Sequence, residues 1–184
     1  MSKSQIKIET ITTDEYKKSS HPQQIDYGFH PTIFGNCLIG VADNKICYLG
    51  FPKDKDIATR EMQRHWPKSN LIEKAAPTLE ILKKLFNNDT QGKFSLLLKG
   101  TPFQISVWQA LLATAYGSTI SYEAIARKTT SQKAVRAAAS AVASNNISYL
   151  VPCHRVIKKS GEIHKFRWGT DIKRQMLEYE SAKL

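Results

Sequence analysis

The chain has 184 residues, with 27 lysines and arginines against 16 aspartates and glutamates, so its formal net charge is +11. This length suits one domain or two small ones, and a hydrophobic fraction of 41% is typical of a globular core, which excludes disordered and fibrous classes. The charge favours polyanionic partners, nucleic acid above all, although solubility alone would also account for it.

The cysteines and the chain's N-terminus bear on its compartment. Cys37, Cys47 and Cys153 are odd in number and widely spaced, which predicts neither a disulfide framework nor a Cys-x-x-Cys metal site. The first ten residues, MSKSQIKIET, lack the apolar segment of a secretory signal, and no apolar run is long enough to span a bilayer. We therefore expect a protein of the reducing cytoplasm, without a membrane partner. We expect no metal, because the histidines show no ligand spacing with the cysteines.

The first half of the chain, residues 1–98, alternates between β-like and helical patterns. Two β-rich runs flank Asp43 and Asn44, which tolerate turn dihedrals, and a hairpin is therefore predicted. Its two cysteines lie in those runs, where a small buried hydrophobe is the favoured interpretation. The predicted elements are a hairpin over 37–51, helices over 55–66 and 77–87, and a strand over 93–98.

The second half is helical and well punctuated. Thr101, Pro102 and Gln104 form a capping box with proline at the first helical position, and Gly117 is expected to close that helix. The later predicted elements are a short helix over 121–129 capped by Ser121, a helix over 132–144 capped by Ser131 and stopped by Asn145-Asn146, an extended run over 147–151, and a last helix over 171–182 with Met176, Leu177 and possibly Ile172 inward.

The two middle helices, joined by a tight turn in a basic protein, predict a helix-turn-helix. The second is rich in alanine, and Gln132, Arg136 and Ser140 are spaced four apart as one polar stripe. Small residues let a helix backbone enter a DNA minor groove, where proteins also wedge a side chain between bases. The alternative is an alanine-rich helix that simply packs closely against its neighbours.

The stretch VPCHRVI places a cysteine between a proline and a histidine. Pro152 fixes φ and removes a backbone donor, so the thiol of Cys153 is expected at a shaped corner. Arg155, Lys158 and Lys159 make the local sequence electropositive, which favours the thiolate. The alternative is a structural cysteine beside an unrelated histidine, because successive side chains on a strand point to opposite faces.

VPCHRVI, together with SYEAIA and KAVRAAASAVASNN upstream and FRWG downstream, resembles the O6-alkylguanine-DNA alkyltransferases, whose active-site signature is PCHR. The resemblance covers residues 99–180 motif by motif and the first half more loosely, and it is greatest to the bacterial Ada-type branch. The four-cysteine zinc domain of that branch is missing, which suggests a stand-alone repair protein. The resemblance implies an α+β/α fold. A small structural α/β domain over 1–98, with an RNase H-like, ferredoxin-like sheet, precedes a mostly helical DNA-binding and alkyl-acceptor domain over 99–184.

The resemblance implies direct-reversal DNA repair. A cysteine thiolate attacks the alkyl group of O6-alkylguanine, and of O4-alkylthymine, after the base has been flipped out of the helix. The product is an S-alkylcysteine, so the protein acts once and needs no cofactor; no nucleotide-binding motif competes with this interpretation. The implied partner is double-stranded DNA carrying O6-alkylguanine, bound through its minor groove by a monomer.

The resemblance also implies individual roles. Cys153 is the acceptor, His154 takes its proton through a water, Glu180 orients that histidine, and Asn145 braces the turn. Tyr122 helps to turn out the nucleotide and donates to the departing base. The implied DNA-binding residues are Arg136, which fills the vacated place in the base stack, with Tyr122, Gln132, Ala137 and Ser140; the implied pocket residues are Val151, Pro152, Val156, Phe166, Arg167 and Trp168. Without the resemblance, the glutamate would be a solvated carboxylate and the asparagine a helix cap.

One departure and three alternatives remain open. Family members commonly have Gly-Tyr where this chain has Lys165-Phe166, so a pocket closed to large adducts is one expectation. The first alternative is a DNA-binding alkyltransferase-like or regulatory protein with weak or no transfer, against which the presence of Cys153 argues. The second is a Cys/His hydrolase, which would leave the net charge unexplained. The third is a DNA-binding module with a structural cysteine.

Overall fold

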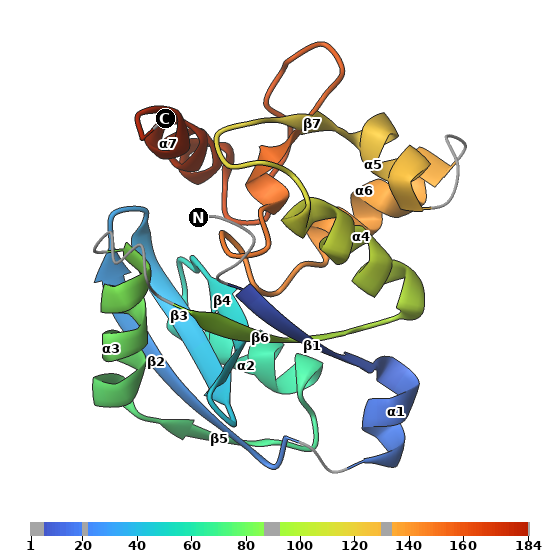
Figure 1. The fold of residues 1–184 in the computed structure, drawn as a ribbon. Helices are drawn as coiled ribbons and strands as arrows, with labels where there is room; N and C mark the ends of the chain where they lie inside the picture. The colour runs from blue at the N-terminus through green and yellow to red at the C-terminus, as the bar shows by residue number, and fades with distance from the viewer. Residues whose placement is uncertain (1–5, 20–21, 87–92, 130–133, 184) are drawn as a thin grey trace. The chain divides into compact units, whose positions relative to one another are not determined.

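The computed structural model describes residues 6–19, 22–86, 93–129 and 134–183. The described residues divide into two compact units, one that ends at Lys99 and one that begins at Gly100. Over the described residues it is an α/β structure with one mixed sheet, a two-stranded sheet and seven α-helices (Figure 1). The mixture of helices and strands that the sequence predicts is therefore observed.

Six strands of the first unit form one sheet in the order β1-β6-β4-β3-β2-β5 (Figure 1). The strands are β1 (Ile6–Thr12), β2 (Gln24–Thr32), β3 (Gly35–Ala42), β4 (Lys45–Gly50), β5 (Asn70–Glu73) and β6 (Phe94–Gly100). β2, β3 and β4 pair antiparallel, whereas β5 joins β2 and β6 joins β4 in parallel. The parallel pairs need crossover connections, which the helices between these strands provide.

The predicted hairpin is confirmed as β3 and β4. Its two turn residues, Asp43 and Asn44, have φ values of 49° and 59°, the left-handed pair that a two-residue hairpin turn requires. Cys37 and Cys47 are 0% and 1% exposed in these strands. Burial raises the pKa of both thiols, so each is a small core hydrophobe, as expected.

Three helices accompany the sheet. They are α1 (Thr13–Lys18), α2 (Lys55–His65) and α3 (Ala75–Phe86). α3 packs against β2 and β3. α2 lies so close to β3 that a Cβ on Gly40 would come within 2.9 Å of the Met62 sulfur. α3 begins two residues before the predicted start, which leaves Pro77 inside the first turn, where a missing N–H removes no helical hydrogen bond.

The second unit carries the remaining elements. They are α4 (Pro102–Leu112), β7 (Ile120–Ser121), α5 (Tyr122–Thr129), α6 (Val135–Ala143), a 3₁₀ turn (Cys153–Arg155), β8 (Val156–Ile157) and α7 (Thr170–Ser181). The predicted capping box is present: Thr101 Oγ1 accepts from Gln104 N at 3.2 Å, and Gln104 Oε1 accepts from Thr101 N at 2.9 Å. α4, α5 and α6 pack against one another, and Trp108 Nε1 donates to Ala141 O at 2.8 Å.

Two local predictions are wrong, and one lies outside the described residues. α4 ends at Leu112, five residues before Gly117, whose φ of 69° belongs to a later turn. The segment 147–151 is not extended, because Tyr149 adopts a φ of 71° and the chain turns there. This turn buries all five side chains, which an extended strand with alternating faces would not do. Ser131, the predicted cap of α6, is not among the described residues.

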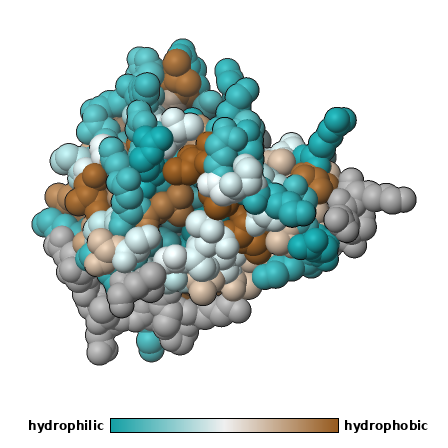
Figure 2. Space-filling view, turned by 90° about the horizontal axis from the view of Figure 1, so that it is seen from above, coloured by the Kyte–Doolittle hydropathy of each residue, from teal (hydrophilic) through white to brown (hydrophobic). Residues whose placement is uncertain are grey.

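The surface is largely hydrophilic, as the many charged residues of the sequence lead one to expect. On the face shown in Figure 2, hydrophilic residues predominate, and hydrophobic ones appear in several smaller areas between them. Within the described ranges, no helix is long and apolar enough to cross a membrane.

Candidate active site

Cys153 stands at the start of the 3₁₀ turn that follows Pro152, with 5% of its surface exposed. Asn145 holds the thiol in place. Its Nδ2 donates to Cys153 Sγ at 3.1 Å and to Val151 O at 2.9 Å, and its Oδ1 accepts from Ile147 N at 2.9 Å. Because every donor and one acceptor of the amide are used, its orientation is determined and one N–H points at the sulfur. Helix α6 stops before this asparagine, whose φ is not left-handed.

His154 is fully buried, with its Nε2 2.9 Å from Glu180 Oε1. An ionised carboxylate only accepts, so Nε2 carries the hydrogen. Burial lowers the pKa of His154 more than Glu180 raises it, and the ring is therefore neutral with a lone pair on Nδ1. Nδ1 is buried and has no hydrogen-bond partner among the described residues. The Tyr149 ring stacks on this imidazole at 5.8 Å and 15°.

Glu180 lies on α7 with 1% exposure and accepts from four donors. Besides the histidine, Arg155 Nε donates to Oε2 and Arg155 Nη2 to Oε1, both at 2.8 Å, and Gly117 N donates to Oε2 at 3.1 Å. Burial acts to raise the pKa of this carboxyl, but the hydrogen bonds from His154 and Arg155 outweigh it and lower the pKa to about 2. The carboxylate is therefore ionised at neutral pH.

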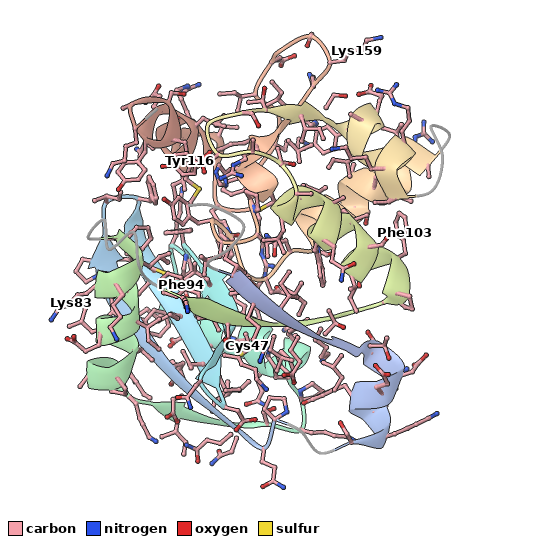
Figure 3. All side chains as sticks on the ribbon, in the orientation of Figure 1. Cys47, Lys83, Phe94, Phe103, Tyr116 and Lys159 are labelled. Carbon is pink, nitrogen blue, oxygen red and sulfur yellow. The ribbon has the colours of Figure 1, made fainter. Side chains whose placement is uncertain are left out.

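The three cations that follow Cys153 in sequence do not surround its thiol. Arg155 is bound to the buried carboxylate. Lys158 pairs with Glu162 at 2.7 Å on the surface, and Lys159 is exposed at the end of its loop, pointing away from the protein (Figure 3). The prediction that these three cations favour the thiolate is therefore wrong. Burial raises the pKa of the Cys153 thiol above its usual value.

Lys173 supplies the cation that sequence reasoning missed. It is 1% exposed on α7, and its Nζ donates to Val156 O at 2.5 Å. Burial lowers its pKa to about 8, and its charge in turn acts to lower the pKa of Cys153. The signal that could have found it is the spacing of Lys173, Met176 and Glu180, which share the inward face of the helix. Of the apolar residues predicted to face inward, only Met176 is buried.

Cys153 opens onto a small cavity of about 30 Å³. Its lining consists of Tyr122, Val142, Ala143, Asn145, Ser148, Cys153, Lys165, Phe166, Arg167 and Lys173. β7 leads directly into Tyr122 and β8 directly follows the 3₁₀ turn, so the pairing of these strands brings the phenol to the thiol. Burial raises the pKa of Tyr122, which keeps its proton available for donation.

The predicted pocket residues divide into two groups. Phe166 and Arg167 line the cavity. The other four, Val151, Pro152, Val156 and Trp168, are buried and do not line it. They are apolar side chains on the segments that carry the site, and in a folded chain such side chains pack into the core behind it. The cavity residues that the sequence did not indicate are Val142, Ala143, Ser148 and Lys173.

Helix α6 presents the predicted DNA-contacting residues that lie in the described ranges. Arg136, Ala137 and Ser140 are exposed, whereas Ala138 and Ala141 are buried. The alanines thus lie on both faces of the helix, some packed inside and some on the surface. Gln132 lies outside the described residues.

The site combines a positioned thiol, a neutral imidazole and an ionised carboxylate that binds the imidazole. These are the residue types that a nucleophile, its base and the group orienting that base require. Within the described residues, no group of three His, Cys, Asp or Glu side chains could hold a metal ion. The site therefore fits the class of proteins that use a cysteine as a nucleophile.

Comparison with known proteins assigns the chain to a family. Residues 102–182 match the model of the 6-O-methylguanine DNA methyltransferase, DNA binding domain. The chain is 31% identical to the methylated-DNA–protein-cysteine methyltransferase of Haemophilus influenzae, over 84% of this chain and 85% of that protein. It is 31% identical to the bifunctional transcriptional activator/DNA repair enzyme Ada of Escherichia coli, over 93% of this chain and 49% of that protein.

A solved structure agrees with these relatives. The crystal structure of Mycobacterium tuberculosis OGT in complex with DNA superposes with a TM-score of 0.69 and 26% identity, over 86% of this chain and 94% of that one. The chain belongs to the methylated-DNA–protein-cysteine methyltransferase family, and the resemblance seen in its motifs is confirmed. It spans about half the length of the Ada relatives that it matches.

Proposed function

We propose that this chain repairs DNA by moving the alkyl group of O6-alkylguanine, and of O4-alkylthymine, irreversibly onto Cys153. The observation that carries the proposal is the Cys153 thiol itself, held by Asn145 at 3.1 Å in a cavity that also contains Tyr122. The names of the relatives, methylated-DNA–protein-cysteine methyltransferases, support this assignment.

The buried groups support a direct displacement. The thiol proton passes through a water to Nδ1 of His154, and Glu180 stabilises the imidazolium that forms. The thiolate attacks the O-alkyl carbon, so that an S–C bond forms as the C–O bond breaks. The electron pair remains on the base, where Tyr122 donates its phenolic proton or a hydrogen bond to the departing guanine. The thioether product is a poor leaving group, and the protein acts once.

The proposed partner is double-stranded DNA, supported by the relative crystallised with DNA and by the net charge of +11. We assign residues 99–184 as the DNA-binding and alkyl-acceptor domain, with α5 and α6 as a helix-turn-helix in the minor groove, and residues 1–98 as a structural domain. The exposed Arg136 would replace the flipped base in the stack, with Ala137 and Ser140 beside it. The protein would act as a monomer in the cytoplasm.

The proposal is tested by incubating the protein with a duplex that carries one O6-methylguanine, followed by trypsin digestion and mass spectrometry. We expect a mass gain of one methylene on the peptide 137–155, and no more than one methyl group per protein. An undamaged duplex is the control. If Cys153 stays unmodified while the damaged duplex is bound, the chain is instead a DNA-binding alkyltransferase-like protein without transfer.

Lys165 is expected to limit the size of the transferred group. It lines a cavity of about 30 Å³ at a position where family members commonly have glycine. We expect Lys165→Gly to speed transfer from O6-benzylguanine at least about tenfold, which corresponds to about 1.4 kcal/mol of transition-state free energy. Transfer from O6-methylguanine should change less than about twofold, because a methyl group is small enough to avoid this side chain.

The measurement compares single-turnover rates on duplexes carrying the two adducts. His164→Gly is the matched control. It introduces the same glycine at the neighbouring position, but His164 does not line the cavity, whereas Lys165 does. Equal benzyl rates in the wild type and the Lys165→Gly variant would contradict the expectation.

A further inference from the structure

Ser148 is the cavity-lining residue whose hydroxyl lies within hydrogen-bond distance of the thiol. It is 1% exposed, and its Oγ lies 3.9 Å from Cys153 Sγ. The same oxygen lies 2.6 Å from Nε1 of Trp168, which is 8% exposed and outside the cavity lining. Three buried groups therefore form a chain from the indole through the hydroxyl to the sulfur.

The direction of these hydrogen bonds follows from the chemistry of the groups. An indole nitrogen can only donate, so Trp168 occupies a lone pair of the Ser148 oxygen. The hydroxyl keeps its own hydrogen for another acceptor, and a Cys153 thiolate can only accept. Among the described residues, the structure offers the Cys153 sulfur as its partner. A hydroxyl that accepts from an indole is also a better donor, because hydrogen bonds in a chain polarise one another.

We propose that Ser148 is a catalytic residue that donates to the Cys153 thiolate, and that Trp168 is a positioning residue that directs this hydroxyl toward the sulfur. The inference rests on the proposed function, in which the thiolate is the attacking species. Together with Asn145 Nδ2, it gives the sulfur two donors, one from just before the turn over 147–151 and one from within it. The 3.9 Å distance shortens once the sulfur carries a charge, as catalytic hydrogen bonds do when the reacting state forms.

The hydrogen-bonded series Trp168–Ser148–Cys153 accounts for two features of the site. Burial works against the thiolate, so donors aimed at the sulfur are needed to offset it. The left-handed Tyr149, φ 71°, reverses the chain directly after Ser148, and this keeps the hydroxyl on the side of the cavity. Trp168, predicted as a wall of the pocket, instead acts from behind it through its N–H.

The test measures the rate at which iodoacetamide alkylates Cys153 as a function of pH, with the modified peptide identified by mass. We expect Ser148→Ala to slow alkylation at pH 7 about tenfold and to move the rate profile to higher pH, because a donor to the charged form is lost. Trp168→Phe should slow it about threefold. In the Ser148→Ala background, Trp168→Phe should change nothing further, since the hydroxyl it acts on is absent.

Trp108→Phe is the matched control, because it also removes a buried indole N–H bond, to Ala141 O, but none that leads to the sulfur. It should lower stability and leave the pH profile in place. An unchanged profile in Ser148→Ala, or equal effects of Trp168→Phe with and without the hydroxyl, would overturn the proposal. If Ser148→Ala does not fold, the contrast between Trp168→Phe and Trp108→Phe decides: a shift in the first alone supports the chain of donors, and no shift in either overturns it.

The assay separates this inference from the proposed function, because iodoacetamide reports on the thiol without DNA. Methyl transfer from an O6-methylguanine duplex is measured in parallel. If the profile shifts in Ser148→Ala but the wild-type protein takes no methyl group from DNA, the donors stand and the repair function falls. If methyl transfer occurs and the profile does not shift in Ser148→Ala, the repair function stands and the proposed donors fall.

Discussion

A Cys153→Ala variant is expected to bind a duplex containing O6-methylguanine as tightly as the wild type and to transfer no alkyl group. The change removes the atom that forms the new bond, so the transfer rate should fall at least about a thousandfold. The exposed face of α6, with Arg136, Ala137 and Ser140, is untouched. Gel-shift titration measures binding, and single-turnover methyl transfer measures the reaction.

Cys47→Ala is the control for this experiment. Cys47 is buried in β4 with a raised thiol pKa, and the same holds for Cys37 in β3. Neither thiol can replace the lost nucleophile, and Cys47→Ala should transfer at the wild-type rate if the protein folds. Residual transfer by the Cys153→Ala protein, with alkyl groups on another cysteine, would show that the acceptor has been assigned to the wrong residue.

Glu180→Ala should have the largest effect on stability. The change leaves the Arg155 guanidinium and the Nε2–H of His154 buried without their acceptor, and breaking a buried ion pair from one side costs about 3–5 kcal/mol. The free energy of unfolding is measured in urea. Glu178→Ala is the matched control, because this glutamate is exposed on the same helix and its loss should change stability by less than about 0.5 kcal/mol. Similar losses in both variants would contradict this account.

The same carboxylate predicts how stability depends on acid. Its pKa is lowered from 4.5 in the unfolded chain to about 2 in the folded protein, so the folded state holds the charged form more strongly. This contribution is fully present above about pH 4.5 and is lost as the pH falls from there towards 2, with a total of about 3 kcal/mol. The urea midpoints of the wild type and the Glu180→Ala variant should therefore differ clearly at pH 6 and less at pH 3.

The elements that the sequence determined are those that short-range patterns specify. The capping box at Thr101, the Asp43-Asn44 turn and the apolar spacing of the helices each act within a few residues, and the structure contains all of them. The motif VPCHRVI and its upstream and downstream partners likewise identified the family, because the order of residues alone carries that information. The turn at Tyr149 was missed, since a short run rich in β-branched and aromatic residues is also typical of a strand.

The tertiary structure decided which groups surround the thiol. The neighbours in sequence, Arg155, Lys158 and Lys159, point elsewhere, and the cation that acts to lower the pKa of Cys153 is Lys173, twenty residues further along. Ser148 and its indole donor also become visible only when the chain folds back on itself. The physical reason is that pKa values and hydrogen bonds depend on burial and on distance in space. Sequence alone could single out Cys153 among the three cysteines, but only packing determines which groups surround its thiol.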